Sequence, residues 1–190
     1  MVDKKDRIIE IAQKIFARFG IQKSTMDEIA KMARMGKATL YYYFKSKEDI
    51  FAEVIKKESR IIKQKMIEEI IKAETPQEQL KAYVHTRMKH LKELSNYYTT
   101  LTDEYMEHYS FVEKERAEFT EYEVNTLTSI LNSGIEKGVF DLEDVQLTAK
   151  MITIALKGLE YPILIEVSIE NIEPTINAML NVLFKGLEKR

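Results

Sequence analysis

The segment from Ser24 to Glu48, STMDEIAKMARMGKATLYYYFKSKE, constrains the fold of this chain more than any other stretch. Its pattern predicts two short helices joined by a tight turn. Thr25 and Glu28 have the spacing of a capping box, so the first of these helices is predicted to begin at Met26. Gly36 lies where this helix must reverse direction, and glycine tolerates the positive φ that such a turn often needs.

The second predicted helix carries side chains that fit a DNA-binding helix-turn-helix. It runs from Ala38 to about Phe44 and contains three consecutive tyrosines; Ser46 then caps a third helix, with Asp49 placed to answer the cap. In helix-turn-helix motifs the start of the second helix contacts base edges, and Lys37 stands at this start. The same pattern also fits a plain helical hairpin whose tyrosines only pack, and the segment alone leaves both interpretations open.

Charge is divided unequally along the chain. Through Lys47 there are 11 Lys and Arg against five Asp and Glu, a net charge of +6, whereas the whole chain carries −2. The remaining residues therefore carry −8. A basic N-terminal end on an acidic remainder favours phosphate binding at that end only.

The same segment resembles the DNA-binding domain of the tetracycline-repressor (TetR) family, whose pattern is roughly T-x-x-x-I-A-x-x-A-G-V-S-x-G-T-L-Y-x-Y-F-x-S-K-E. The matching residues here are Thr25, Ile29, Ala30, Ala33, Lys37, Thr39, Leu40, Tyr41, Tyr43, Phe44, Ser46, Lys47 and Glu48. Three turn positions depart from the pattern: Arg34 stands where the family usually has Gly, Gly36 where it has a capping Ser, and Ala38 where it often has Gly.

Roles in DNA binding follow partly from reach and partly from this resemblance. Lys37 can donate to guanine O6 and N7, and Ala38 is small enough for close approach to a base or a thymine methyl. The resemblance implies that Tyr41 also enters the groove. It further implies that phosphates are bound by Thr25, Thr39, Tyr42, Tyr43 and Lys47. Leu40 and Phe44 are predicted to be core residues that close a three-helix domain against the helix 4–19, whose apolar stripe is Ile8, Ala12, Ile15 and Phe19.

Several other classes of site and location are not supported by the sequence. The chain has no cysteine, so disulfides and Cys-ligated zinc are excluded, and His85 and His90 are five residues apart and do not share a helix face. We predict no metal site, no cofactor and no catalytic residues, because no nucleophile–base motif or Gly-rich phosphate loop is present. No apolar run approaches the ~20 residues that span a bilayer, and no signal peptide is seen, so a cytoplasmic protein is expected.

Beyond residue 46 the chain predicts a further set of helices. One long helix runs from Ser46 to about Ala73, and Thr75-Pro76-Gln77-Glu78 gives a second capping box with proline at the first helical position. Further helices are predicted to about Leu94, over 96–108, over 111–137 with an end at Gly138, from about Asp141 to Glu166, and from about Glu173 onward.

Tyrosines are concentrated between residues 97 and 122. An aromatic stripe at helical spacing is usually core, yet buried tyrosine hydroxyls need polar partners, which suits a half-polar cavity. Because the TetR resemblance implies an effector site here, we expect a pocket for a small apolar or amphipathic molecule. Its predicted lining residues are Met88, Tyr98, Leu101, Tyr105, Phe119, Tyr122 and Met151.

The two C-terminal helices are too apolar for an exposed surface and predict burial against a second chain; by resemblance they form a four-helix bundle at a two-fold axis. We therefore expect an all-α chain of about nine helices, with a DNA-binding domain over 1–46 and a ligand-binding and dimerisation domain over 47–190. The predicted function is a homodimeric repressor that binds a palindromic double-stranded operator and is released by its effector. The alternative is a helical protein-interaction adaptor without sequence-specific DNA binding.

Overall fold

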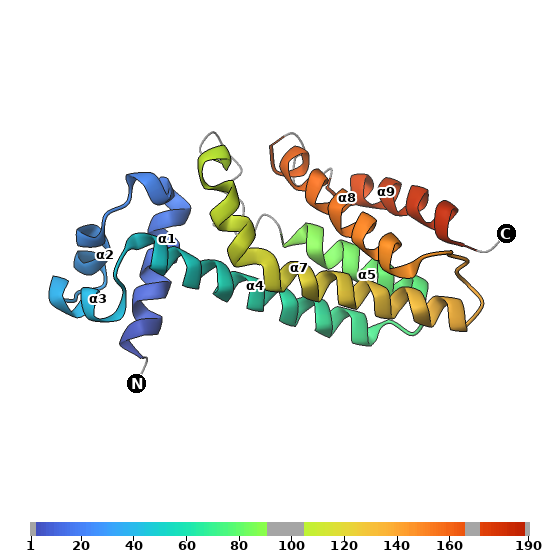
Figure 1. The fold of residues 1–190 in the computed structure, drawn as a ribbon, viewed down its shortest axis with the longest axis horizontal. Coiled ribbons are helices and arrows are strands. Elements are labelled where there is room, and N and C mark those ends of the chain that lie inside the picture. The colour runs from blue at the N-terminus through green and yellow to red at the C-terminus, as the bar shows by residue number, and fades with distance from the viewer. Residues whose placement is uncertain (1–2, 91–104, 166–171, 189–190) are drawn as a thin grey trace. The chain divides into compact units, whose positions relative to one another are not determined.

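The computed structural model describes residues 3–90, 105–165 and 172–188 (Figure 1). Eight helices lie within these ranges, which hold no strand and only one isolated backbone bridge, between Phe140 and Glu188. The prediction of an all-α fold is therefore confirmed. Within the same ranges no helix is long and apolar enough to cross a membrane. The chain divides into two compact units, which we describe separately.

The first unit takes in Met1–Arg60 and Leu94–Arg116, of which 3–60 and 105–116 are described. It begins with three helices that we call the head: α1 (Lys4–Lys23), α2 (Met26–Met32) and α3 (Lys37–Tyr43). Neighbouring helices of the head pack on one another, α1 on α2 and α2 on α3, as the blue part of Figure 1 shows. The unit also contains the first half of α4 (Lys47–Lys72).

The core of the head confirms most of the predicted apolar stripe. The buried residues, each at most 4% exposed, are Ile8, Ala12, Ile15, Phe16, Ile29, Ala33, Leu40 and Phe44. Phe19 is the exception: it was predicted to be buried and is 50% exposed, with the Arg18 guanidinium 5.1 Å from its ring centre. The break at Gly20, with φ of 76° and ψ of 163°, turns the chain just after Phe19 and ends the buried stripe before it.

The start of α4 follows the predicted cap. The backbone N–H of Asp49 donates to Ser46 Oγ over 3.1 Å, and the Asp49 carboxylate accepts from the backbone N–H of Lys45 over 3.1 Å. These two bonds satisfy backbone donors that a helix start leaves without intrahelical partners. The observed bounds, Lys47–Lys72, confirm the long helix predicted over 46–73.

The second unit, which we call the body, takes in Ile61–Glu93 and Ala117–Arg190. Its described helices are the second half of α4, α5 (Pro76–Lys89), the larger part of α7 (Tyr105–Glu136), α8 (Val145–Ile165) and α9 (Ile172–Leu187). Helix α5 packs on α9, and the Lys63 ammonium of α4 lies 4.5 Å from the ring centre of Tyr122 on α7. The body is thus a bundle of roughly parallel and antiparallel helices (Figure 1).

Local signals placed the ends of the body helices well. Thr75 and Glu78 form the predicted capping box at the start of α5. Helix α5 ends at Lys89, and the predicted continuation to Leu94 and most of the predicted helix 96–108 lie outside the described residues. Helix α7 starts at Tyr105, six residues earlier than predicted, while α8 starts at Val145, where Asp144 rather than Asp141 accepts from the Leu147 N–H over 2.9 Å.

The end of α7 depends on two glycines. Gly138, the predicted stop, has φ of 70°, a conformation that glycine adopts without the strain of a side chain. Gly134, one turn earlier, receives the ring of Phe140: a Cβ at Gly134 would lie 1.9 Å from Phe140 Cδ2. The Phe140 ring is therefore seated directly on the α7 backbone, and it is 2% exposed.

Candidate nucleic-acid interface and effector site

Helix α2 is fixed by the capping box that the sequence predicted. Glu28 N–H donates to Thr25 Oγ1 over 3.2 Å, and the Thr25 N–H donates to Glu28 Oε2 over 2.9 Å. The Thr25 hydroxyl also donates to Glu28 Oε2 over 2.9 Å. The predicted phosphate-binding Thr25 is exposed, but its hydroxyl already serves as the cap of α2.

The turn between α2 and α3 corrects one prediction. Gly36 has φ of −67°, so it does not supply the positive φ expected there; it is the N-cap of α3, without a side-chain cap bond. The positive φ, 54°, falls on Arg34, which is the position where the resembling pattern has Gly. A non-glycine residue in the left-handed region costs roughly 1–2 kcal/mol, so the turn stores backbone strain at Arg34.

Helix α3 separates its core residues cleanly from its outer ones. Leu40 is fully buried and Phe44 is 4% exposed, as predicted. The outer side carries the predicted DNA-contacting residues: Lys37, Ala38, Tyr41 and Tyr42 are exposed, and Thr39 and Tyr43 are half-buried. Tyr42, 83% exposed, lies edge-to-face with Tyr43 at 5.1 Å between ring centres, so this tyrosine offers almost its whole surface to a partner.

The two lysines that were predicted to contact DNA, Lys37 and Lys47, are already bonded to residues of the head. Lys37 Nζ lies 2.8 Å from Asp27 Oδ1 and 3.0 Å from Asp27 Oδ2, an ion pair that joins the starts of α3 and α2. The hydrogen bond to the Asp27 carboxylate, with its charge, raises the pKa of the Lys37 ammonium above its ordinary value. Lys47 Nζ donates to the backbone carbonyl of Gln22 over 3.1 Å.

The predicted effector residues fall into three groups in the body. Met88 is fully buried and Phe119 is 6% exposed, and Tyr122, half-buried, lies 6.1 Å from Phe119 between ring centres. Met151 is 55% exposed on the outer side of α8. Tyr98 and Leu101 lie outside the described residues, and Tyr105 begins α7 with its side chain also outside them. The described structure therefore groups Phe119 with Tyr122 and places Met151 on an exposed surface.

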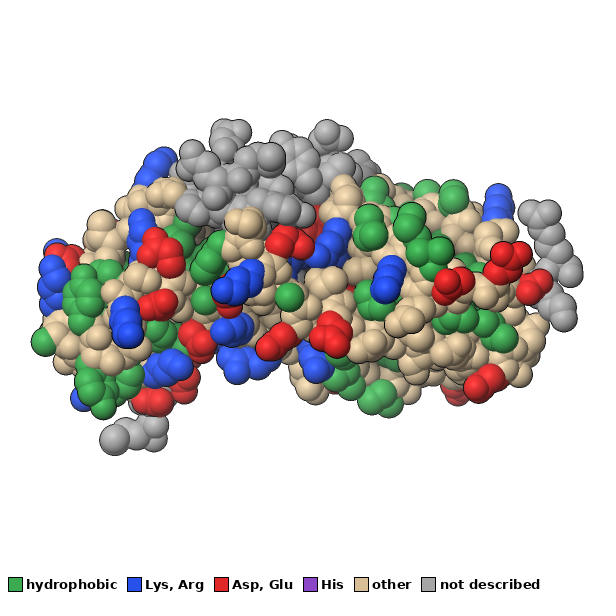
Figure 2. Space-filling view, viewed as in Figure 1, with side chains coloured by type: hydrophobic (Ala, Val, Ile, Leu, Met, Phe, Trp, Pro, Cys, Tyr) green, Lys and Arg blue, Asp and Glu red, His purple; other side chains and the backbone are tan. Residues whose placement is uncertain are grey.

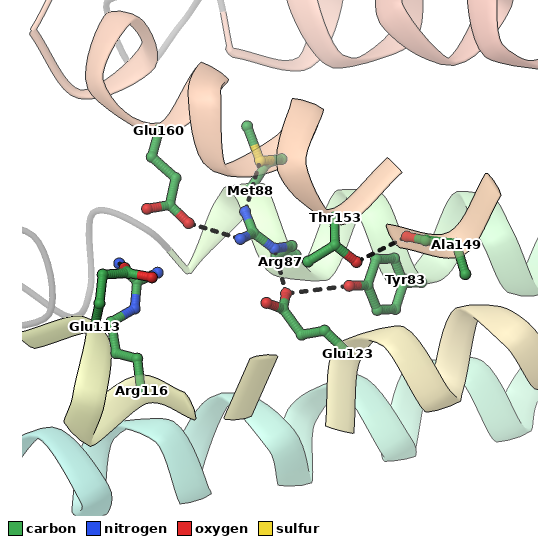
Figure 3. A network of polar contacts seen from close by, with 9 residues as sticks. All are labelled: Tyr83, Arg87, Met88, Glu113, Arg116, Glu123, Ala149, Thr153 and Glu160. Atoms are coloured by element: carbon green, nitrogen blue, oxygen red, sulfur yellow. Dashed lines mark hydrogen bonds and ion pairs between the residues drawn. The ribbon is translucent and has the colours of Figure 1, made fainter. Parts of the chain in front are cut away.

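A buried polar network, which the sequence analysis did not predict, joins α5, α7 and α8 (Figure 3). Arg87 of α5 donates from Nε to Glu123 Oε1 of α7 and from Nη2 to Glu160 Oε1 of α8, the latter over 2.6 Å. All three side chains are at most 2% exposed. The Tyr83 hydroxyl also donates to Glu123 Oε1, over 3.1 Å, and burial followed by the Glu123 charge raises the pKa of Tyr83 well above 10.0.

This network, which we call the Arg87 hub, joins one guanidinium to carboxylates from two other helices. One guanidinium is bonded to two carboxylates, and Glu123 Oε2 has no hydrogen-bond partner in the described structure. The sequence signal was Tyr83 and Arg87 at i, i+4 among apolar neighbours on one helix, a spacing that places both on one face. A buried arginine is rarely left unpaired, which could have prompted a search for its carboxylates.

The described surface of the body includes an apolar hollow and a polar hollow. One is apolar, with a volume of about 460 Å³, and is lined by Leu147, Thr148, Met151, Ile152, Ala155, Leu156, Met179 and Leu183 of α8 and α9. Leu147, Ile154 and Val182 are exposed on the same two helices, over which Figure 2 shows hydrophobic side chains gathered. The predicted apolar surface of the C-terminal helices is therefore present in this chain.

The other hollow is polar, and His85 and His90 are among its lining residues. Its volume is about 480 Å³, and it is lined by Lys65, Glu68, Glu69, His85, Thr86, Lys89, His90 and Glu173. His90 Nδ1 lies 3.1 Å from Lys65 Nζ, and His85 Nε2 lies 3.1 Å from Asn177 Oδ1. Across the residues that the structure describes, no group of three or more potential ligands is placed to hold a metal ion.

Comparison with known proteins gives matches to the head and matches over most of the chain. A family model described as bacterial regulatory proteins of the tetR family matches residues 8–54. The uncharacterized HTH-type transcriptional regulator YhgD of Bacillus subtilis is 44% identical over 64 residues, and this match spans 34% of each protein. The HTH-type transcriptional regulator QacR of Staphylococcus aureus is 28% identical over 159 residues, 82% of this chain and 83% of QacR.

A solved structure extends the likeness over the body. The transcriptional regulator FadR of Bacillus subtilis, in complex with stearoyl-CoA, superposes with a TM-score of 0.77 at 26% sequence identity. The match covers 95% of this chain and 98% of FadR, so it includes residues of the body as well as the helix-turn-helix.

Proposed function

We propose that this chain is a repressor of the TetR family of bacterial transcriptional regulators and that its DNA binding responds to a small ligand. The family consists of regulators, so the chain is not an enzyme. The observation that carries the proposal is the division of α3 into a buried side, Leu40, and an exposed side that begins with Lys37 and continues through Tyr41 and Tyr42. Such a helix can enter a major groove while its inner face keeps the head folded.

We assign roles to the exposed side chains by position. Lys37 and Ala38 lie at the start of α3 and Tyr41 one turn later, and all three would face base edges, with Lys37 donating to guanine O6 and N7. The remaining predicted contacts would bind phosphates: Thr25, Thr39, Tyr42, Tyr43 and Lys47. Thr25 caps a helix N-terminus, where backbone N–H groups favour an anion.

The proposed binding unit is a homodimer formed through α8 and α9. A single short recognition helix contacts too few base pairs for specificity, whereas a two-fold pair contacts two half-sites of a palindromic operator. The support is the apolar surface of these helices, on which Leu147, Met151 and Ile154 are more than half exposed. We retain the functional division into a DNA-binding part over 1–46 and a ligand-binding and dimerisation part over 47–190, in a cytoplasmic protein.

The proposed effector is a small apolar or amphipathic molecule bound within the body. FadR of Bacillus subtilis was solved with stearoyl-CoA, an amphipathic ligand, and this supports the same class here. Phe119 and Tyr122 supply aromatic surface close together in space, and Met88 supplies a buried apolar side chain on α5. Binding would move α4 and change the spacing of the two recognition helices, provided that the ligand prefers one of the two arrangements.

The proposal is tested by DNA binding of the purified full-length protein. A duplex is first selected from a randomised library, and its affinity is then measured against potassium chloride concentration. About six phosphates neutralised per dimer give a slope of roughly −5 in log affinity against log salt. Lys37→Ala should relax sequence preference, while Lys47→Ala should weaken all sequences alike. A monomer that binds no duplex at low salt would refute the proposal and favour a protein-binding adaptor.

A further inference from the structure

The residue that faces Lys37 across the helix-turn-helix is an acid. Asp27, in the first turn of α2, takes the Lys37 ammonium between its two carboxylate oxygens at 2.8 and 3.0 Å. The side chains of Lys37 and Asp27 are 60% and 65% exposed, so the pair lies on the outer surface of the head. Nothing in the motif requires an acid here, and the family resemblance gave Asp27 no role.

Because of this pair, DNA must compete with Asp27 for Lys37, the proposed base-contacting lysine. An ammonium bonded to a carboxylate must give up that partner before it donates to a base or to a phosphate. Exposed ion pairs contribute little to stability, so the exchange is within reach of a base that offers two acceptors in the correct positions. A phosphate offers a charged acceptor on any sequence, but the Asp27 carboxylate beside Lys37 repels that phosphate at the same time.

We propose that Asp27 is a specificity-determining residue of the DNA interface, which reserves Lys37 for a base edge and withholds it from phosphates of random sequence. The inference rests on the proposed function. Asp27 acts through Lys37 and contacts no DNA itself. Its carboxylate lowers binding to random DNA more than binding to the preferred site, because only the preferred site returns two hydrogen bonds to the released lysine.

The competing explanation is that Asp27 only stabilises α2, since an acid in the first turn of a helix interacts favourably with the helix dipole. That role would make Asp27→Asn affect folding and all DNA alike. Asp6 provides a matched control, because it is also an exposed acid in the first turn of a head helix, α1, and no contact joins it to Lys37. Asp27→Glu provides a second comparison that keeps the charge beside Lys37.

The experiment measures affinity of the full-length protein for two duplexes of equal length: one selected by the wild type from a random library, and one of scrambled sequence. Asp27→Asn should raise affinity for the scrambled duplex about threefold to tenfold and change affinity for the selected duplex by less than about twofold. Because one lysine per subunit is released, the salt slope on scrambled DNA should steepen by about 2 per dimer. Asp27→Glu should behave nearly as the wild type, and Asp6→Asn should shift both duplexes alike.

The coupling to Lys37 decides the matter. In a Lys37→Ala background, Asp27→Asn should lose its selective effect, because no lysine remains to be released. The inference is overturned if Asp27→Asn changes both duplexes equally, or if its selective effect survives in the Lys37→Ala background. A wild type that binds no duplex at all overturns the proposed function, and this inference with it, whereas binding without an Asp27 effect overturns the inference alone.

Discussion

Replacing Arg34 tests whether the helix-turn-helix stores strain in its turn. Arg34 has φ of 54°, a region that costs a non-glycine residue roughly 1–2 kcal/mol. Glycine removes this cost but gains unfolded-state freedom, which takes back about 0.5–1 kcal/mol. Arg34→Gly should therefore stabilise the head by about 0.5–1 kcal/mol relative to the wild type.

The comparison with Arg34→Ala isolates the backbone. Both variants lack the guanidinium, so their difference reports only how Gly and Ala tolerate this conformation. We expect Arg34→Gly to be more stable than Arg34→Ala by about 1 kcal/mol, which corresponds to roughly a fivefold difference in an opening equilibrium.

Amide hydrogen exchange is the suitable assay, because it reports opening of α2 and α3 separately from unfolding of the rest of the chain. The amides of Ala33 and Leu40, bonded to the carbonyls of Ile29 and Gly36, should exchange about fivefold more slowly in Arg34→Gly than in Arg34→Ala. Equal protection in the two variants, or greater protection in Arg34→Ala, would refute the assignment of strain to this turn.

Three further outcomes follow from the described structure. Gly134→Ala should lower the free energy of unfolding by about 1–3 kcal/mol, because its Cβ would lie 1.9 Å from the Phe140 ring. A lowered midpoint of thermal unfolding that Phe140→Leu partly restores would support this, and an unchanged midpoint would contradict it. Arg87→Met should lower the free energy of unfolding by about 3–5 kcal/mol, because it removes the guanidinium that is bonded to two buried carboxylates, Glu123 and Glu160. In urea unfolding, the triple variant that adds Glu123→Gln and Glu160→Gln should recover much of this loss, and no recovery would argue against charge as the cause. Hydrogen bonds from the Thr75 backbone and side chain, and then from the Glu74 backbone, lower the pKa of Glu78 below 4.5, so the carboxylate stabilises α5 above that pH and this stabilisation is lost as the carboxyl protonates. Glu78→Gln should therefore weaken the dependence of helicity on acid pH, measured by circular dichroism. The same loss of helicity at acid pH in both proteins would count against this cap.

The parts of this fold that could be predicted depend on residues close to one another in the sequence. The capping boxes of Thr25 and Thr75 and the stop at Gly138 depend on side chains within a few positions of the backbone groups they satisfy. The buried and exposed sides of α3 followed from helical period in the same way.

The missed parts depend on tertiary pairing or on backbone conformation that residue type conceals. Arg87 lies 36 residues from Glu123 and 73 from Glu160, distances over which no periodicity indicates a partner. The positive φ was assigned to Gly36 because glycine is its usual carrier, yet it lies on Arg34, in the turn that joins the two packed helices α2 and α3. Phe19 matched the stripe but lies directly before the break at Gly20, where its side chain is half exposed.

The Arg87 hub limits how the body can respond to anything it binds. A planar guanidinium holds its carboxylates only over a narrow range of positions, and here those carboxylates belong to two different helices. Gradual sliding of α8 past α5 would break the buried ion pair between Arg87 and Glu160 before a new one formed. We therefore expect the body to keep its present register or to change to another in one step, so that the proposed response to a ligand would be abrupt.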